Sequence, residues 1–408
     1  MQLRQYTRIP VSALNLKFAA WQKVRWLLHP FGAFIITRLA IFAAAFIGDI
    51  MLPTDPGHWV PGAGNPFLDL LARWDSQWYQ WIVQEGYWLR PGQRSNVAFF
   101  PLYPMAIDLV APFVGNNTVL AGVIISNAAF LALLIVLYQL TRLESGSDQT
   151  ARRTVFYLAI FPTSFFFSMM YTESLFLFFM IAALYFARKQ LWVWAALMGL
   201  LAGTARVVGV LTWGLVMWEW LRVHGWNIEA IHRQQSWRNL WDGLKRDWTD
   251  ILVIALIPLG ILSYIVFLQQ NFKDPVAFST VQSAWGRENI GPWAVIVRDI
   301  RVLSSEGMGL GNLSRILNLT TMAVILGMSV TIWRRLGAGY ALFTLLALLI
   351  PATSASQSLM RYAVVCFPVF MIFGMWGKHT TFDRAYSTIA AVLLGVLTIV
   401  SVTWVFVA

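Results

Sequence analysis

The sequence has little charge and almost no cysteine. Only 12% of its 408 residues are Asp, Glu, Lys or Arg, and Cys366 is the single cysteine. One cysteine excludes an internal disulfide, and the five histidines show no ligand spacing, so neither residue type predicts a metal centre. The net charge of +11 is not gathered into one basic patch, and we therefore expect no nucleic-acid partner.

Long apolar runs dominate instead. Hydrophobic residues make up 58% of the chain, and the mean hydropathy is +0.62. We predict an all-α polytopic membrane protein, a single integral membrane domain over residues 1–408 that contacts membrane lipids, with about eleven transmembrane helices. The expected helices are 31–50, 118–140, 154–169, 173–188, 191–205, 207–221, 251–268, 313–333, 338–353, 362–376 and 385–407.

The positive charges indicate the orientation of the chain. With the N-terminus inside, most Lys and Arg residues fall in inner segments such as 222–250, which we expect to be a cytoplasmic surface loop. Two long outer loops then remain, 51–117 and 269–312, whereas the other outer connections are only turns. We therefore predict a cytoplasmic N-terminus and a functional site on the outer face.

The first outer loop combines aromatic residues, acids and arginines. Residues 68–89 place several tryptophans on one face at helical spacing, which predicts an interfacial helix at headgroup depth. A second interfacial helix is expected over 97–114. Asp75 follows Trp74 on the first helix, where an aromatic-lined carboxylate could act as a base. The alternative is a surface aspartate paired with Arg73.

Four further charged residues interrupt apolar segments. Glu173 lies between two apolar segments, where an unpartnered carboxylate costs about 3 kcal/mol. It either serves a site, where it has a partner, or begins the returning helix. Arg206 is isolated, and either serves a site or snorkels to the interface. Arg361, next to Tyr362, begins an apolar helix, which favours either a bound phosphate or a plain interface anchor. Arg38, inside the first helix, is expected to snorkel inward.

The second outer loop holds Gln282 and Arg287 within about a turn and a half of helix. Such groups suit contact with a sugar or a headgroup, although solvated loop helices look similar. A transporter or lipid flippase is a rival class for a chain of this kind, and it predicts repeated halves around a central site. No repeat is visible, and the candidate residues gather on one side, which favours an enzyme.

Four motifs closely resemble those of one family, in the same order. They are RWDSQWYQWIVQEGY with SNVAFFPLYP within 73–104, YTESLF at 171–176, ARVVG at 205–209 and SLMRYAVVCFP at 358–368. The chain thus resembles the PIG-V family, the GPI mannosyltransferase II type, in its bacterial branch. The resemblance implies a GT-C glycosyltransferase fold and a bacterial plasma membrane. It also implies that Asp75 is catalytic, with Glu173, Arg206 and Arg361 at the outward-facing site.

The reaction that the resemblance implies moves a hexose, with mannose expected, from a polyprenyl-phosphate sugar to a lipid-linked or cell-envelope glycan acceptor. Asp75 would be the general base of an inverting transfer, and Arg361 and Arg206 would bind the donor phosphate. The other residues expected to line the site are Trp74, Arg73, Glu173, Tyr362, Gln282 and Arg287. We expect no cofactor; a divalent metal is not favoured, although Glu173 could supply a second ligand beside Asp75. A glycan ligase that uses a diphosphate carrier stays open as an alternative.

Overall fold

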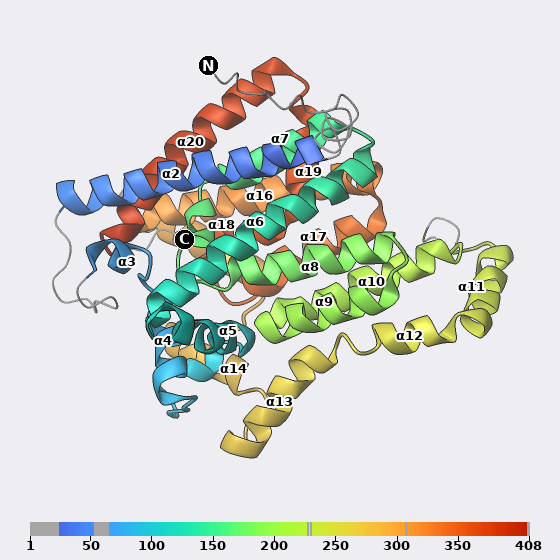
Figure 1. The fold of residues 1–408 in the computed structure, drawn as a ribbon, viewed down its shortest axis with the longest axis horizontal. Coiled ribbons are helices and arrows are strands. Elements are labelled where there is room, and N and C mark those ends of the chain that lie inside the picture. The colour runs from blue at the N-terminus through green and yellow to red at the C-terminus, as the bar shows by residue number, and fades with distance from the viewer. Residues whose placement is uncertain (1–23, 53–64, 227, 229–230, 307–308, 406–408) are drawn as a thin grey trace, which may run out of the picture.

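The computed structural model describes residues 24–52, 65–226, 228, 231–306 and 309–405. Within these residues every regular element is a helix, which confirms the predicted all-α class. Expectations about the chain before residue 24 and about residues 53–64 of the first outer loop lie outside the described residues. Most long helices run alongside one another, and α11 (Gln234–Arg246) lies across one end of them (Figure 1).

The first half of the chain forms α2 (Leu28–Met51), α3 (Pro66–Leu70), α4 (Ser76–Glu85), α5 (Leu102–Val110), α6 (Thr118–Ser145), α7 (Asp148–Ala159), α8 (Glu173–Arg188), α9 (Trp192–Ala205) and α10 (Leu211–Val223). Polar N-caps begin both α6 and α7. The side chain of Asn117 accepts from the N–H of Leu120 where α6 begins, and Ser147 does the same for Thr150 in α7. Gly146 ends α6 in a left-handed conformation, so the chain reverses there in a short turn.

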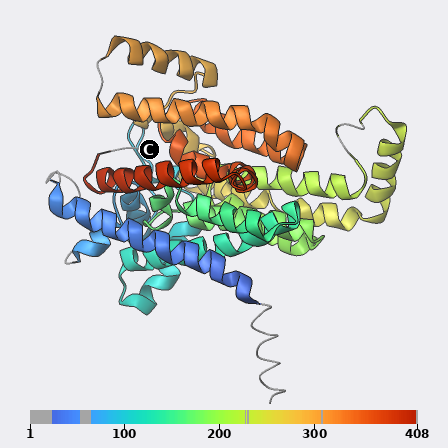
Figure 2. The ribbon, with the colours of Figure 1, turned by 90° about the horizontal axis from the view of Figure 1, so that it is seen from above.

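The second half forms α12 (Trp248–Ile254), α13 (Leu259–Phe272), α14 (Ala277–Thr280), α15 (Pro292–Ser305), α16 (Leu310–Leu336), α17 (Ala338–Ala352), α18 (Leu359–Tyr362), α19 (Phe367–Trp376) and α20 (Thr380–Val402). In the centre, α8 packs against α6, α9 and α10. The last helix, α20, packs along α2, so the first and last parts of the described chain lie side by side (Figure 2).

Four helices of the described chain, α2, α6, α16 and α20, are long and apolar enough to cross a membrane. The number rises to six if two bent pairs each form one span. The α12 and α13 pair bends by 43°, and the segments Leu359–Val365 and Phe367–Trp376 bend by 76°. The integral membrane class is thereby confirmed, whereas the expected total of about eleven spans stays a prediction.

Four of the predicted helices are broken in the structure, and one of them, 362–376, is interrupted between the two segments that bend by 76°. The expected interfacial helix 68–89 is interrupted between α3 and α4, and the expected helix 154–169 ends with α7 at Ala159. The expected helix 251–268 is divided into α12 and α13. Pro258 lies directly before the first residue of α13. Proline lacks an N–H group and therefore favours such a break. Over 97–114, only α5 is α-helical, and it lies between two 3₁₀ turns.

The irregular segment between α7 and α8 is held by Arg38 of α2. Its guanidinium donates to the carbonyls of Ala159 at 3.3 Å and Ser164 at 3.1 Å. It also donates to the hydroxyls of Ser164 and Ser168 and lies 4.4 Å over the ring of Phe130. Irregular backbone persists inside a membrane protein only where its polar groups find partners. The expectation that Arg38 snorkels inward is wrong, because its side chain is buried and provides hydrogen-bond partners for this irregular backbone.

We expect Arg38→Met to lower the free energy of unfolding by about 1–3 kcal/mol, because the buried carbonyls and hydroxyls lose their donor. Thermal unfolding of the purified protein measures the effect. Arg152→Met is the matched control, since the Arg152 side chain is 47% exposed, and it should change the stability by less than about 0.5 kcal/mol. Equal melting temperatures for the two variants would contradict this role of Arg38.

Candidate active site

Asp75 lies in a tight turn between α3 and α4, where a continuous helix was predicted. Trp74 has φ 60°, a left-handed conformation that few residues other than glycine adopt, and this interrupts the helix. The hydroxyl of Tyr171 accepts from the N–H of Asp75 at 3.0 Å and donates to the carbonyl of Arg73 at 3.1 Å. Tyr171 therefore holds the turn. The Asp75 carboxylate does not cap α4 and remains available for other contacts.

Four charged residues that are distant in the sequence meet beside this turn. Arg361 donates from Nη1 to Oδ2 of Asp75 at 2.7 Å and from Nε to Oε1 of Glu173 at 2.6 Å. Arg206 donates from Nη1 to the same Glu173 oxygen at 2.6 Å. Two guanidiniums and two carboxylates thus form one electroneutral chain of ion pairs. Neutralisation of this kind is what allows charged groups to be buried.

Burial within this group increases from Asp75 to Glu173. The Asp75 side chain is 29% exposed, whereas those of Arg361 and Glu173 are 6% and 2% exposed. The Arg361 guanidinium also lies 4.8 Å from the ring centre of Phe166 and 4.6 Å from that of Tyr171. These rings and the two ion pairs fix the orientation of Arg361. Glu173 therefore forms the buried base of the group, and Asp75 forms its accessible end.

A cavity of about 1020 Å³ opens beside the group, and Asp75, Arg206 and Arg361 all line it. This volume is at the upper end of the range for small-molecule sites, so a sugar and part of a second ligand fit together. Apolar side chains form part of the wall as well. Val207 is 39% exposed and Ile350 is 42% exposed. Beside the group of four, the cavity thus offers the Asp75 carboxylate, the guanidiniums of Arg206 and Arg361, and an accessible apolar surface.

The structure brings together most of the residues that the sequence singles out. The cavity is also lined by Trp74, Tyr362, Gln282 and Arg287. Arg287 donates to the side chain of Gln282 at 3.1 Å. Glu173 is not on the cavity wall, because it lies behind the two arginines that it binds. Arg73 is not on the wall either; it pairs with Asp69 at 2.7 Å and not with Asp75, which corrects both expectations for Arg73.

Two further expectations about the arginines are wrong. Arg361 does not begin a long helix, because α18 has only four residues and a 3₁₀ turn follows before α19 begins. Its burial also excludes the role of a plain interface anchor. Arg206 does not snorkel to the interface, since it follows the last residue of α9 and is ion-paired to Glu173. Both side chains instead turn inward to the same carboxylate.

Sequence reasoning missed two contributors to the site and one residue of the cavity wall. Tyr171 and Phe166 position the turn and Arg361, and Glu288 is an exposed carboxylate on the cavity wall. Tyr171 could have been found, because it begins the YTESLF motif that contains Glu173. Glu288 directly follows Arg287, but nothing in its local sequence distinguishes it from a solvated loop residue. Among the described residues, Asp75 and Glu288 are the carboxylates that line the cavity.

Comparisons with known proteins bear on the identity of the chain. A family model described as Mannosyltransferase (PIG-V) matches residues 42–285, more than half of the chain. The crystal structure of ArnT from Cupriavidus metallidurans bound to undecaprenyl phosphate is similar, with a TM-score of 0.49 and 14% identity over 91% of this chain and 76% of that chain. No curated protein matches. The family match includes the motifs of Asp75, Glu173 and Arg206 and confirms the resemblance, so this protein belongs to the PIG-V mannosyltransferase family and is a membrane glycosyltransferase.

Proposed function

We propose that this protein transfers a hexose, with mannose expected from its family, from a polyprenyl-phosphate sugar to a lipid-linked or cell-envelope glycan acceptor. The transfer takes place on the outer face of a bacterial plasma membrane, and the N-terminus is cytoplasmic. One observation carries the proposal. The accessible carboxylate of Asp75 lies 2.7 Å from the buried Arg361 on the wall of a single cavity, with Arg206 on the same wall.

Asp75 acts as the general base in this proposal. The acceptor hydroxyl gives its proton to the Asp75 carboxylate while the acceptor oxygen bonds to the anomeric carbon of the sugar. The bond between that carbon and the phosphate oxygen breaks, and its electron pair leaves with the lipid phosphate. A single displacement of this kind inverts the anomeric configuration. The partial exposure of Asp75 supports the assignment, because an acceptor can reach it from the cavity.

Arg361 and Arg206 bind the donor phosphate and stabilise the charge that develops on it as it leaves. A guanidinium has five N–H donors. Arg361 uses two nitrogens for Glu173 and Asp75, and Arg206 uses one for Glu173, so both keep donors for a phosphate. Glu173 holds the two guanidiniums in place and offsets their charge while no donor is bound.

The apolar part of the cavity favours a lipid-linked donor over a soluble one. Val207 and Ile350 present accessible apolar surface on the same wall as the two arginines. An isoprenoid chain gains free energy by covering such surface, at roughly 25 cal/mol per Å². A soluble nucleotide sugar has no isoprenoid chain to cover it. This combination supports a phosphate headgroup with an apolar tail.

The configuration of the product tests this function. A polyprenyl-phosphate mannose of defined anomeric configuration should give a product of the opposite configuration, which digestion with anomer-specific mannosidases identifies. The reaction is run with and without EDTA, and we expect equal rates, because Asp75 is paired with Arg361 and the proposed chemistry uses no metal. Retention of configuration would contradict the single displacement. A rate that EDTA abolishes and Mg²⁺ or Mn²⁺ restores would contradict the metal-free account.

A further inference from the structure

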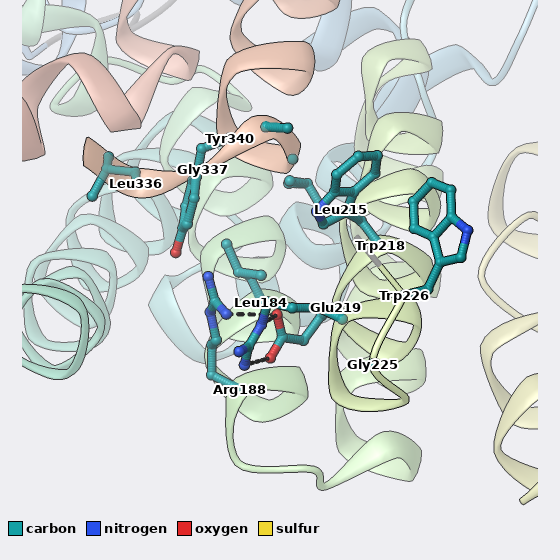
Figure 3. A pocket seen from close by; sticks show the side chains of 13 residues that line it. Leu184, Arg188, Leu215, Trp218, Glu219, Gly225, Trp226, Leu336, Gly337 and Tyr340 are labelled. Atoms are coloured by element: carbon teal, nitrogen blue, oxygen red, sulfur yellow. Dashed lines mark hydrogen bonds and ion pairs between the residues drawn. The ribbon is translucent and has the colours of Figure 1, made fainter. Parts of the chain in front are cut away.

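A second cavity, of about 320 Å³, lies at the other end of the central helices. Figure 3 shows the residues that line it. Helix α8 begins at Glu173, behind the active-site cavity, and ends at Arg188, which lines the second cavity about 22 Å away. Helix α17 runs in the opposite direction, from Ala338 at the second cavity to Ile350 at the active site. The two cavities therefore lie at opposite ends of the same helices and share no lining residue.

Buried ion pairs form one wall of the second cavity. Arg188 contacts Glu144 and Glu219 at 2.6 Å each. Arg222 binds both oxygens of Glu219, through Nη2 at 2.6 Å and Nε at 2.9 Å, and Tyr340 donates to Glu144 at 3.0 Å. Glu219 is only 2% exposed, whereas the Arg222 side chain is 53% exposed. The carboxylates are thus enclosed, and a guanidinium is what a ligand meets.

Two exposed arginines lie next to this cavity in the sequence. Arg334 and Arg335 are exposed near the end of α16, whose last residue lines the cavity. Trp218 and Trp226 form an aromatic wall, with their ring centroids 5.6 Å apart and their planes at 82°. Basic residues with tryptophan at the end of membrane helices are typical of contacts with lipid headgroups.

We propose that this cavity binds the phosphate of an anionic phospholipid headgroup in the leaflet opposite the active site. Arg222 is the principal contact, because its side chain is half exposed and Glu219 keeps Arg188 as an ion-pair partner when Arg222 turns to the phosphate. Trp218 and Trp226 contact the glycerol and upper acyl region. The site is separate from the proposed sugar transfer and does not depend on its chemistry.

Thermal unfolding of the purified full-length chain in neutral detergent tests the site. Three additions are compared: phosphatidylglycerol, phosphatidylcholine and inorganic phosphate. We expect phosphatidylglycerol to raise the melting temperature by about 2–4 °C and the other two to leave it unchanged. An equal rise with phosphatidylcholine would overturn the preference for an anionic headgroup. An equal rise with inorganic phosphate would overturn the assignment to a lipid.

Two variants locate the effect. Arg222→Gln removes the accessible guanidinium. Ala338→Glu places a carboxylate in the first turn of α17, where the helix dipole favours it, so this variant should fold while repelling a phosphate. Both should lose the rise caused by phosphatidylglycerol, whereas the control Arg152→Gln, at a half-exposed arginine that does not line the cavity, should keep it. A full rise in Ala338→Glu would overturn the proposal.

Discussion

Asp75→Asn is expected to lower the rate of sugar transfer by about 10²–10⁴-fold while the protein stays folded. Asparagine cannot take the acceptor proton, but its side-chain oxygen can still accept from Arg361, so the turn and the ion-pair group should keep their geometry. The loss should appear in kcat, with the KM for the donor close to that of the wild type. Turnover of radiolabelled polyprenyl-phosphate mannose in membranes that carry each variant measures both quantities.

Glu288→Gln is the matched control, because Glu288 is the other carboxylate on the described cavity wall. It should transfer sugar at nearly the wild-type rate. Transfer by Asp75→Asn as fast as by the wild type would show that Asp75 is not the base. A large loss in Glu288→Gln alone would move that role to Glu288.

Arg361→Met should have the largest combined effect on stability and donor binding. It removes the guanidinium that pairs with Asp75 and leaves Glu173 paired with Arg206 alone. Removing one partner of a buried ion pair costs about 3–5 kcal/mol of stability. The donor phosphate also loses its most firmly held partner. We therefore expect a melting temperature several degrees lower and a donor KM at least about tenfold higher.

A double variant separates these two effects. Arg361→Met with Asp75→Asn removes one positive and one negative charge, and Glu173 keeps its ion pair with Arg206. We expect most of the lost stability to return, because no carboxylate of the group is left without a guanidinium. The donor KM should stay high. Recovery of the wild-type donor KM in the double variant would show that Arg361 only supports the fold.

The helical class and many helix positions could be predicted from the sequence. The expected helix 173–188 coincides with α8, because an acid at its start and a basic residue at its end delimit a strongly apolar run. The breaks could not be predicted. The passage after α7 depends on Arg38, whose partner Ser164 is 126 residues away. The interruption at Trp74 depends on the hydroxyl of Tyr171, which fixes the turn from a distant segment.

The members of the candidate site were predictable, but their arrangement was not. Motifs singled out Asp75, Glu173, Arg206 and Arg361, yet only the fold places Glu173 behind the arginines and Asp75 on the cavity wall. Depth of burial is a property of tertiary packing, and local sequence does not encode it. The second cavity was missed for a related reason, because the sequence predicts Arg188 and Arg222 to be ordinary charges of inner loops.

In the proposed function a lipid phosphate carries the sugar to Asp75. To test this, the purified protein is given radiolabelled mannose on two donors, polyprenyl phosphate and a sugar nucleotide, in the presence of a membrane glycan extract as acceptor. We expect transfer from the polyprenyl-phosphate donor, with stoichiometric release of polyprenyl phosphate, and none from the nucleotide. Transfer from the sugar nucleotide without any from the lipid donor would contradict it.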